Sequence, residues 1–290
     1  MSTIIDGKKI SAEIKKEIAH KVNELKGEGR RAPHLAIIIV GDDGASHTYV
    51  NGKINACKAV GFDFTLMHFA TTISEAKLIK HIEQLNDDSD IDGFIVQIPL
   101  PDHISVEHIT ECISSKKDVD GFTNQNFGSI TSSHKLLLPA TPFGIMELIK
   151  RYDIETEGKE CVVVGASRIV GAPLSLMMLQ DGKATVTVCH KYTGDLKKHT
   201  KNADILIVAV GHPGLITKDM VKEGAVVIDV GTTRVEDDSR KSGFRLCGDV
   251  DYENVAPLTS YITPVPGGVG PMTIASLLLN TLKAYEAQNH

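Results

Sequence analysis

Tyr49 and Lys53 lie four residues apart in the segment TYVNGKINACK, residues 48–58. On a helix, residues with this spacing lie on the same side, about one turn from each other. A phenol and an ammonium so placed can act on one substrate, as a Tyr-x-x-x-Lys catalytic pair does. The alternative is one face of an ordinary surface helix, because the bare pattern often occurs by chance. The choice depends on the other motifs of the chain.

A glycine-containing loop, VVVGASRIVGAP, carries Gly165, Ser167 and Gly171 after an apolar segment. Glycine after a parallel strand lets the backbone approach a phosphate, and the next helix offers free N–H groups and the positive end of its dipole. Because the spacing is not Gly-x-Gly-x-x-Gly, a tight strand-to-helix turn is the alternative. The strand pattern around the loop favours a dinucleotide site.

The segment VCHKYT indicates which dinucleotide is bound. An NAD site usually has Asp or Glu about 20 residues after the glycine loop, where the carboxylate binds the ribose hydroxyls. This chain has His190 and Lys191 there, and no carboxylate. With Arg168 in the first loop, these basic residues favour the 2′-phosphate of NADP. The alternative is that Arg168 and Lys191 are solvated loop charges.

Three further segments carry candidate residues. The loop PVPGGVGPMT has three prolines and three glycines before Thr273, which is expected to begin the last helix. Such a loop can hold one irregular backbone shape against a flat ligand, so we predict a functional loop rather than a connector. Gln97 ends the strand GFIVQIPLP, at the edge where open α/β sheets bind ligands. Asp118 and Asp120 share the turn KKDVDGF, where either alone is an ordinary turn residue.

Alternating strands and helices are expected to position these residues. In the first half, helices are predicted over residues 9–29 and 74–86, the latter capped by Ser74, and a helix holds Tyr49 and Lys53. The predicted strands are LAIIIV, DFTLMHF and IDGFIVQIPLP. Near residue 141 a linking helix, TPFGIMELIKRYDI, begins a second alternating region. Its predicted strands are KECVVVG, ATVTVCH, ADILIVAVG and AVVIDVG.

The pattern predicts an α/β protein of two domains. Four short apolar strands separated by helices or loops are typical of a Rossmann-like, doubly wound parallel sheet. We assign residues 141–271 to this domain. Residues 1–140 form the other α/β domain, and the final amphipathic helix, 272–290, is expected to pack back on it.

Composition limits the classes of function. The 290 residues include 37 acidic and 31 basic side chains, a net charge of −6, which gives no general attraction for nucleic acid or an anionic membrane. Five scattered cysteines, without Cys-x-x-Cys spacing, indicate neither disulfides nor a zinc site, and no other metal is expected. The start has no signal h-region and the apolar runs are too short to span a bilayer, so we expect a cytoplasmic protein.

Together the motifs resemble one enzyme family. They are Tyr49-x-x-x-Lys53, VQIPLP, KDVDGF, VGASRIVGAP, ATVTVCH, GDVD and TPVPGGVGPMT. In this order, from about residue 4 to residue 283, they resemble the methylenetetrahydrofolate dehydrogenase/cyclohydrolase family. The resemblance implies oxidation of 5,10-methylenetetrahydrofolate with NADP, then hydrolysis to 10-formyltetrahydrofolate, in one cleft between the two domains. It also implies a homodimer formed through the second domain.

The resemblance also implies roles for individual residues. Lys53 would be the central group of the hydrolysis, and Gln97 would hydrogen-bond it. Tyr49 would position and stack on the folate, and Asp120 would hold the pterin ring. The other substrate-binding residues would be Pro266, Gly267 and Gly268. The cofactor-binding residues would be Gly165, Ala166, Ser167, Arg168, Ile169, His190, Lys191 and Thr232.

Two departures from the family pattern concern the cofactor. The usual Gly-Arg-Ser has Ala166 in place of arginine, and the usual serine after Cys-His is Lys191. Arg168 and Lys191 can replace these contacts to the 2′-phosphate of NADP. The sequence of the segment around Lys191 also resembles an NAD-using branch of the family. The presence of Lys53 disfavours both a monofunctional dehydrogenase and a noncatalytic folate or nucleotide sensor. Short-chain dehydrogenases are disfavoured because their Tyr-x-x-x-Lys follows the glycine loop.

Overall fold

The computed structural model describes residues 2–42, 44–240 and 243–289. Its contacts divide the chain into two compact units. The six-stranded unit comprises Met1–Ser11 and Thr141–Thr273. The three-stranded unit comprises Ala12–Ala140 and Ile274–His290. Both units combine a parallel sheet with helices, which confirms the predicted α/β class.

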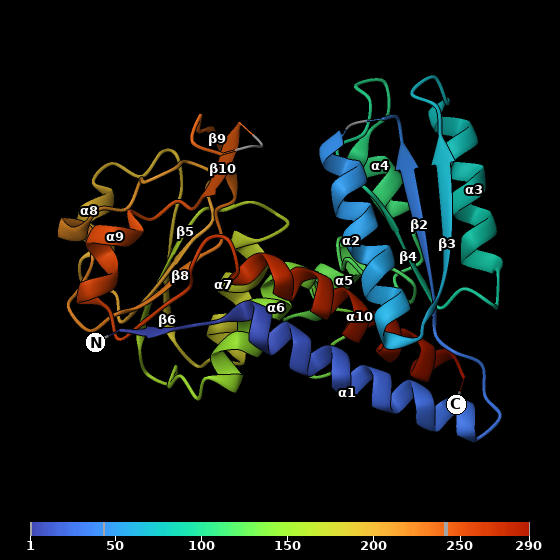
Figure 1. Ribbon diagram of the computed structural model, residues 1–290, viewed down its shortest axis with the longest axis horizontal. Helices are drawn as coiled ribbons and strands as arrows, with labels where there is room; N and C mark the ends of the chain where they lie inside the picture. The colour runs from blue at the N-terminus through green and yellow to red at the C-terminus, as the bar shows by residue number, and fades with distance from the viewer. Residues whose placement is uncertain (1, 43, 241–242, 290) are drawn as a thin grey trace. The chain divides into compact units, whose positions relative to one another are not determined.

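The six-stranded unit contains a fully parallel sheet in the order β1-β11-β8-β7-β5-β6. Strands β5, β6 and β8 of this sheet are labelled in Figure 1. The four predicted strands are β5 (Glu160–Val164), β6 (Thr185–Cys189), β7 (Ile205–Val208) and β8 (Val226–Asp229). Strands β5, β7 and β8 are mostly apolar and buried, as in a sheet covered on both faces, whereas the edge strand β6 alternates Thr and Val and is exposed or half-buried up to Cys189. The accompanying helices are α6 (Ala140–Arg151), α7 (Gly171–Gln180), α8 (Leu196–Thr200), α9 (Tyr252–Val255) and the short 3₁₀ turns Lys218–Met220 and Ala256–Leu258.

The register of this sheet aligns the ends of its central strands. Val164 lies opposite Cys189 on β6 and opposite Val208 on β7. Val208 in turn lies opposite Asp229 on β8. The loops that follow these four residues therefore leave the sheet at one edge, the carboxyl edge.

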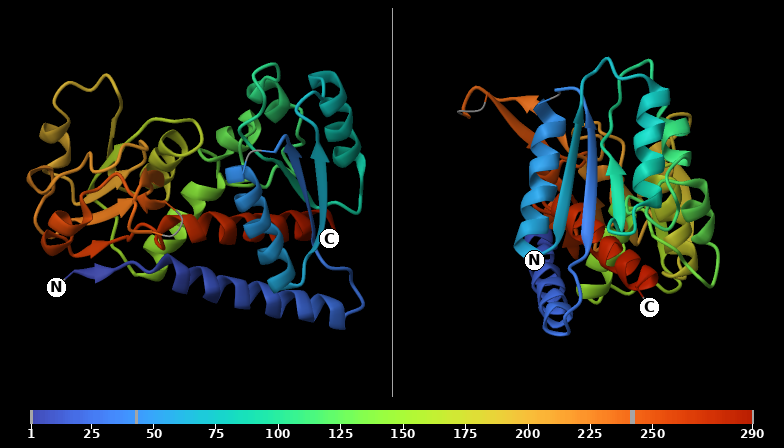
Figure 2. Two further views of the ribbon diagram at one scale, coloured as in Figure 1. Left: turned by 45° about the horizontal axis from the view of Figure 1, so that its top comes forward. Right: turned by 90° about the vertical axis from the view of Figure 1, so that its right-hand side faces the viewer.

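The three-stranded unit has the parallel order β3-β2-β4. Its strands are β2 (His34–Val40), β3 (Asp63–Phe69) and β4 (Gly93–Val96). Its helices include α2 (Gly44–Val60), α3 (Glu75–Asp87), α4 (Val106–Glu111) and α5 (Asn124–Ser129). Helices α2 and α3 lie on opposite faces of the sheet (Figure 2, right). Alternate residues of β2 accordingly face different helices, and Ala36 and Ile38 share a core with Leu78 and Ile82 of α3.

Helices α1 (Gly7–Gly27) and α10 (Val269–Gln288) contribute residues to both units. The end of α10 belongs to the three-stranded unit. Asn280 Nδ2 donates hydrogen bonds to the carbonyl oxygens of Val119 and Leu138, at 2.8 and 2.7 Å. Tyr285 is fully buried, with the Arg31 guanidinium 5.1 Å from its ring centroid.

The structure differs from the sequence prediction in several short elements. The strands β1 (Thr3–Ile4) and β11 (Tyr261–Ile262), and the hairpin of β9 (Thr233–Glu236) and β10 (Phe244–Cys247), were not predicted. Helix α10 begins at Val269 rather than at Thr273. Proline is tolerated there because N–H groups in the first helical turn have no partner within the helix. No helix in the described part of the chain has the length and hydrophobicity to cross a membrane.

Candidate active site

Helix α2 presents Tyr49 and Lys53 on one side, one turn apart. Tyr49 is 53% exposed, whereas Lys53 is 8% exposed. The buried ammonium has a defined partner, because Lys53 Nζ donates a hydrogen bond to Gln97 Oε1 at 3.1 Å. This confirms the contact expected between these two residues. The helix therefore combines an accessible aromatic ring with a sheltered ammonium.

Gln97 immediately follows β4, and its orientation is fixed by two further hydrogen bonds. Its backbone N–H donates to Ile38 O at 2.8 Å, which extends the sheet by one residue. Its side-chain Nε2 donates to Ile98 O at 2.7 Å. Because the amide nitrogen is engaged, the amide oxygen is the atom directed at Lys53. Gln97 thus holds the ammonium without adding charge.

Asp120 lies in the turn that follows a buried carboxylate, Asp118. Asp118 Oδ1 accepts from the Gly121 N–H at 3.0 Å, and Oδ2 accepts from the Thr123 N–H at 2.8 Å and from Asn126 Nδ2 at 2.9 Å. The turn needs glycine at position 121, where φ is +72° and a Cβ would lie 2.5 Å from backbone atoms. Asp118 thereby fixes the backbone that carries the partly buried Asp120.

Charge couples Asp120 to the Lys53 site. Burial raises the pKa of the Asp120 carboxyl, the Lys53 ammonium lowers it, and the Asp118 carboxylate raises it, with a net increase. A carboxyl that retains a proton more readily than usual can both donate and accept hydrogen bonds. The three-stranded unit therefore brings together an ammonium, a neutral amide and a carboxyl of raised pKa.

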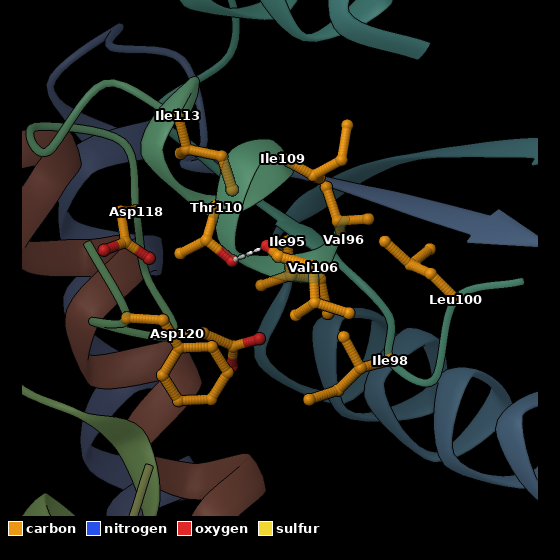
Figure 3. A pocket seen from close by; sticks show the side chains of 11 residues that line it. Ile95, Val96, Ile98, Leu100, Val106, Ile109, Thr110, Ile113, Asp118 and Asp120 are labelled. Atoms are coloured by element: carbon orange, nitrogen blue, oxygen red, sulfur yellow. Dashed lines mark hydrogen bonds between the residues drawn. The ribbon is translucent and has the colours of Figure 1, made fainter. Parts of the chain in front are cut away.

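A small pocket lies beside this turn. Figure 3 shows apolar side chains of β4, α4 and the segment after β4, with Asp118 and Asp120 toward one side. The enclosed volume is about 10 Å³, comparable to one water molecule. Its lining is Ile95, Val96, Ile98, Leu100, Val106, Ile109, Thr110, Ile113, Asp118, Asp120 and Phe122.

The glycine loop of the six-stranded unit is a tight strand-to-helix turn. Gly165 has φ +120°, and a Cβ on it would lie 2.3 Å from Ala209 O. A Cβ on Gly171, the first residue of α7, would lie 1.9 Å from Gly165 O. The residue before the helix, Val170, makes no side-chain capping bond. The loop is closed on itself, because the Val170 N–H donates to Ser167 Oγ at 3.2 Å and the Ala172 N–H to Ser167 O at 3.0 Å, so the structure shows the tight turn that was the alternative interpretation.

The predicted cofactor residues lie on three loops of the carboxyl edge. The loop after β5 exposes Ala166, Ser167, Arg168 and Ile169. The loop after β6 exposes His190 and Lys191, and the loop after β8 exposes Thr232. The Gly165 N–H donates to Cys189 O at 2.8 Å, which joins the first two loops at their origin. Exposed basic side chains and a close backbone approach fit a phosphorylated dinucleotide.

The loop of Pro266, Gly267 and Gly268 belongs to the six-stranded unit, not to the unit of Lys53. Gly267 has φ +112°, and its carbonyl oxygen accepts from the Lys8 N–H at 3.0 Å. A Cβ on Gly268 would lie 2.7 Å from Pro264 O. The candidate site residues are therefore brought together as two groups, one in each unit.

Two buried carboxylates, Asp229 and Asp249, were not predicted as site residues. They are 3% and 0% exposed. Burial raises the pKa of Asp229 to about 6, and three backbone N–H donors oppose the rise. In the sequence, Asp229 is visible only as the carboxylate that ends the apolar strand VVID, and Asp249 only as a carboxylate of the motif GDVD.

Comparisons with known proteins agree with this arrangement. Residues 5–120 match the catalytic domain, and residues 139–289 the NAD(P)-binding domain, of tetrahydrofolate dehydrogenase/cyclohydrolase. The chain is 55% identical over 284 residues to the bifunctional protein FolD of Cytophaga hutchinsonii, covering 97% of this chain and 98% of that protein. It is 54% identical over 285 residues to the FolD protein of Bacteroides thetaiotaomicron, covering 97% of each.

Solved structures give the same result. The bifunctional FolD enzyme of Campylobacter jejuni superposes with a TM-score of 0.93 at 47% identity, covering 99% of both chains. The Trypanosoma brucei FolD, solved with NADP cofactor and an inhibitor, gives 0.94 at 36% identity, covering 99% of this chain and 98% of that one. The chain therefore belongs to the tetrahydrofolate dehydrogenase/cyclohydrolase family.

Proposed function

We propose that this chain oxidises 5,10-methylenetetrahydrofolate to 5,10-methenyltetrahydrofolate with NADP and hydrolyses the product to 10-formyltetrahydrofolate. The observation that carries this proposal is the Lys53–Gln97 hydrogen bond beside Asp120. A relative without the hydrolytic step would have no need of a sheltered ammonium in a fixed position. The reactions belong to one-carbon metabolism. The division of roles follows the predicted domains, with residues 1–140 and 272–290 serving folate and residues 141–271 serving the dinucleotide.

The oxidation depends chiefly on placement. Removal of a hydride leaves an iminium-like carbon, so this step needs orientation more than an acid or a base. The chemistry that bound NADP supplies is hydride acceptance at its nicotinamide ring. In this assignment Tyr49 stacks on the folate and Asp120 hydrogen-bonds the pterin ring. Pro266, Gly267 and Gly268 add a rigid backbone surface for the substrate.

The hydrolysis depends on Lys53. Addition of water to the methenyl carbon and opening of the ring require proton transfers. Gln97 fixes the nitrogen of Lys53 through its amide oxygen, and the low exposure of Lys53 keeps bulk water from replacing that contact. The Asp120 carboxyl holds the ring from which the bridge is opened. We therefore assign Lys53 as the proton-transferring residue and Gln97 as its positioning residue.

Gly165, Ala166, Ser167, Arg168 and Ile169, in the loop before α7, would hold the pyrophosphate. His190, Lys191 and Arg168 receive the 2′-phosphate, and Thr232 contacts the dinucleotide from the loop after β8. The absence of a carboxylate after β6 supports NADP over NAD. NAD remains the second candidate cofactor, because Ala166 replaces the arginine of the family pattern.

The test is an initial-rate assay with NADP and with NAD in parallel. Methenyl absorbance is read with and without an acid quench, since acid converts the 10-formyl product back to the methenyl form. We expect a higher kcat/KM with NADP, and methenyl that becomes visible only after acid. No turnover with either dinucleotide would reject the proposal in favour of a noncatalytic relative. If methenyl forms at the same rate with and without acid, the chain does not hydrolyse it and is a monofunctional dehydrogenase.

We further infer a homodimer formed through the six-stranded unit. Strand β6 is the last strand of that sheet, and an edge strand offers unpaired backbone groups to a second copy. Val188 on β6 and Leu179 on α7 are 41% and 49% exposed. Light scattering after gel filtration is expected to give twice the mass of the chain, and Val188→Lys is expected to reduce it. A monomeric mass for the unmodified protein would contradict the inference.

We also infer that the enzyme works in the cytoplasm. Cys57, Cys112, Cys161, Cys189 and Cys247 are all free thiols. Burial raises the pKa of Cys57 and of Cys161 to about 12, so neither is a reactive thiolate at neutral pH. Free cysteines suit a reducing compartment. Recovery of the activity in a periplasmic or secreted fraction, rather than in the cytoplasmic fraction, would contradict this inference.

A further inference from the structure

Asp229 and Asp249 form a buried carboxylate pair at the carboxyl edge of the six-stranded sheet. Asp229 is the last residue of β8, and Asp249 follows the hairpin strand β10. Asp229 Oδ1 accepts from the N–H groups of Gly231 and Asp249, at 3.0 and 2.9 Å. Its Oδ2 accepts from the Val250 N–H at 2.9 Å. Asp229 therefore ties residues 249–250 to the loop that follows β8.

Asp249 continues this connection to the next loop. Its Oδ2 accepts from the Val210 N–H at 2.7 Å and from the Gly211 N–H at 3.0 Å. These two residues lie in the loop after β7, one residue beyond its start at Ala209. The Thr233 hydroxyl also donates to Gly211 O at 3.3 Å. One carboxylate thus sets the direction of two consecutive peptide groups in a loop of the carboxyl edge.

The two carboxylates lie directly against Gly248 and Gly231, where no side chain would fit. A Cβ on Gly248 would lie 1.9 Å from Asp229 Oδ2, and a Cβ on Gly231 would lie 2.3 Å from Asp249 Oδ1. Within the described residues, Asp249 Oδ1 has no hydrogen-bond partner, although Asp249 is fully buried. Burying two carboxylates this close is costly, so ordinary packing gives little reason for the pair. Positioning of the adjacent loops gives a reason for it.

The sheet order shows which part of a dinucleotide these loops would serve. Strand β6, with the basic residues His190 and Lys191, lies on one side of β5, and β7 and β8 lie on the other. A dinucleotide bound across the carboxyl edge with its 2′-phosphate at β6 extends its nicotinamide half toward β7 and β8. The loops held by Asp249 are the ones on that side.

We propose that Asp249, itself held by Asp229, is the positioning residue for the nicotinamide half of NADP. It acts through the Val210 and Gly211 peptide groups, whose orientation its carboxylate fixes, and it has no role in holding the adenosine half. This inference rests on the proposed use of NADP. It assigns separate parts of the carboxyl edge to the two halves of the cofactor.

The test compares NADP with adenosine 2′,5′-bisphosphate, which contains only the adenosine half. Dissociation constants are measured by calorimetry on the full chain. In Asp249→Asn the two N–H groups lose a charged acceptor, and we expect about tenfold weaker NADP binding. Binding of the bisphosphate is expected to stay within about twofold, because its contacts lie at β5 and β6. The KM for NADP is expected to rise while the KM for the folate substrate stays unchanged.

Asp251→Asn is the matched control. Asp251 lines the same cavity of about 640 Å³ as Asp229, and its carboxylate accepts from Asn254 Nδ2 rather than from the loop after β7. We expect both ligands to bind this variant as they bind the unmodified protein. Asp249→Glu is a second variant that keeps the charge but displaces it, and we expect it to weaken NADP binding selectively as well.

Equal weakening of both ligands in either Asp249 variant would overturn the inference, because it would show general loosening of the unit. Unchanged NADP binding in Asp249→Asn would overturn it as well. If the unmodified protein binds neither ligand, the proposed use of NADP has failed, and with it the basis of this inference.

Discussion

Around Lys53 the candidate functional groups are side chains placed by a hydrogen bond or by burial, whereas at the carboxyl edge of the six-stranded sheet they are exposed side chains on loops whose backbone shape depends on glycine. Lys53, Gln97 and Asp120 present an ammonium, an amide and a carboxyl. At Gly165 and Gly171 any Cβ would collide with backbone atoms of the loops. Chemistry that requires proton transfer uses titratable groups, and recognition of a phosphate uses N–H groups. Substitutions should therefore change reactivity in the first region and shape in the second.

The largest effect on shape is expected from Gly171→Ala. Its Cβ would lie 1.9 Å from Gly165 O and 2.6 Å from the carbonyl carbon, so the backbone of the glycine loop must move. We expect a loss of about 3 kcal/mol in the free energy of unfolding, the upper end for overpacking. Urea unfolding measures it. Gly27→Ala, where nothing lies within 4 Å, is the control and is expected to be neutral. A loss in Gly171→Ala below about 0.5 kcal/mol, the usual range for surface substitutions, would contradict the geometry.

A pH-dependent effect is expected from Asp229. Its pKa rises from 3.8 to about 6 on folding, so the folded state binds this proton more tightly than the unfolded state. The resulting stabilisation is full below the unfolded pKa and is lost as the pH rises through the folded pKa. Relative to Asp229→Asn, the unmodified protein should therefore gain about 2 kcal/mol on going from pH 7 to pH 4. A stability difference that is constant over this range would show that Asp229 does not titrate as described.

Asp120→Asn tests the side-chain region. The variant keeps the shape but can no longer ionise or hold a proton, so we expect about a tenfold higher KM for folate. Steady-state kinetics with saturating NADP give the value. Asp102→Asn, at an exposed position on the same unit, is the control. An unchanged folate KM in Asp120→Asn would reject its role in holding the ring.

The smallest effect is expected from Lys191→Ala. The exposed ammonium lies 4.9 Å from the Tyr192 ring centroid and is one of several basic groups near the loop after β6. We expect kcat/KM with NADP to fall about fivefold at low salt, with that for NAD unchanged. The exposed Lys201 supplies the control, Lys201→Ala. Equal losses with both dinucleotides would show that Lys191 does not select the 2′-phosphate.

The sequence was most informative where structure repeats a simple pattern. Strands β5 to β8 were predicted because each is a short segment rich in Val or Ile, as is usual for a parallel sheet. Strands β1 and β11 have two residues each and no pattern of their own, so only their pairing defines them. The start of α10 was placed four residues late because Pro271 and Gly270 suggest a loop, although the first turn of a helix accepts both.

Within the candidate site, residue types were visible but most partnerships were not. The contact of Lys53 with Gln97, 44 residues away, was expected only through the family resemblance. Asp229 and Asp249 were missed because a single carboxylate after a strand is an ordinary turn residue. Their importance depends on a register between segments 20 residues apart, which no local spacing reveals.

Lys53→Met, with both activities measured in one preparation, tests the central claim most directly. Methionine keeps the length of the side chain but cannot transfer a proton. We predict that hydrolysis falls at least about 100-fold, the usual scale of acid–base catalysis, while the dehydrogenase survives at least in part. Methenyl absorbance should then accumulate without an acid quench. Equal loss of both activities would contradict the account, because it would show that Lys53 mainly binds the substrate.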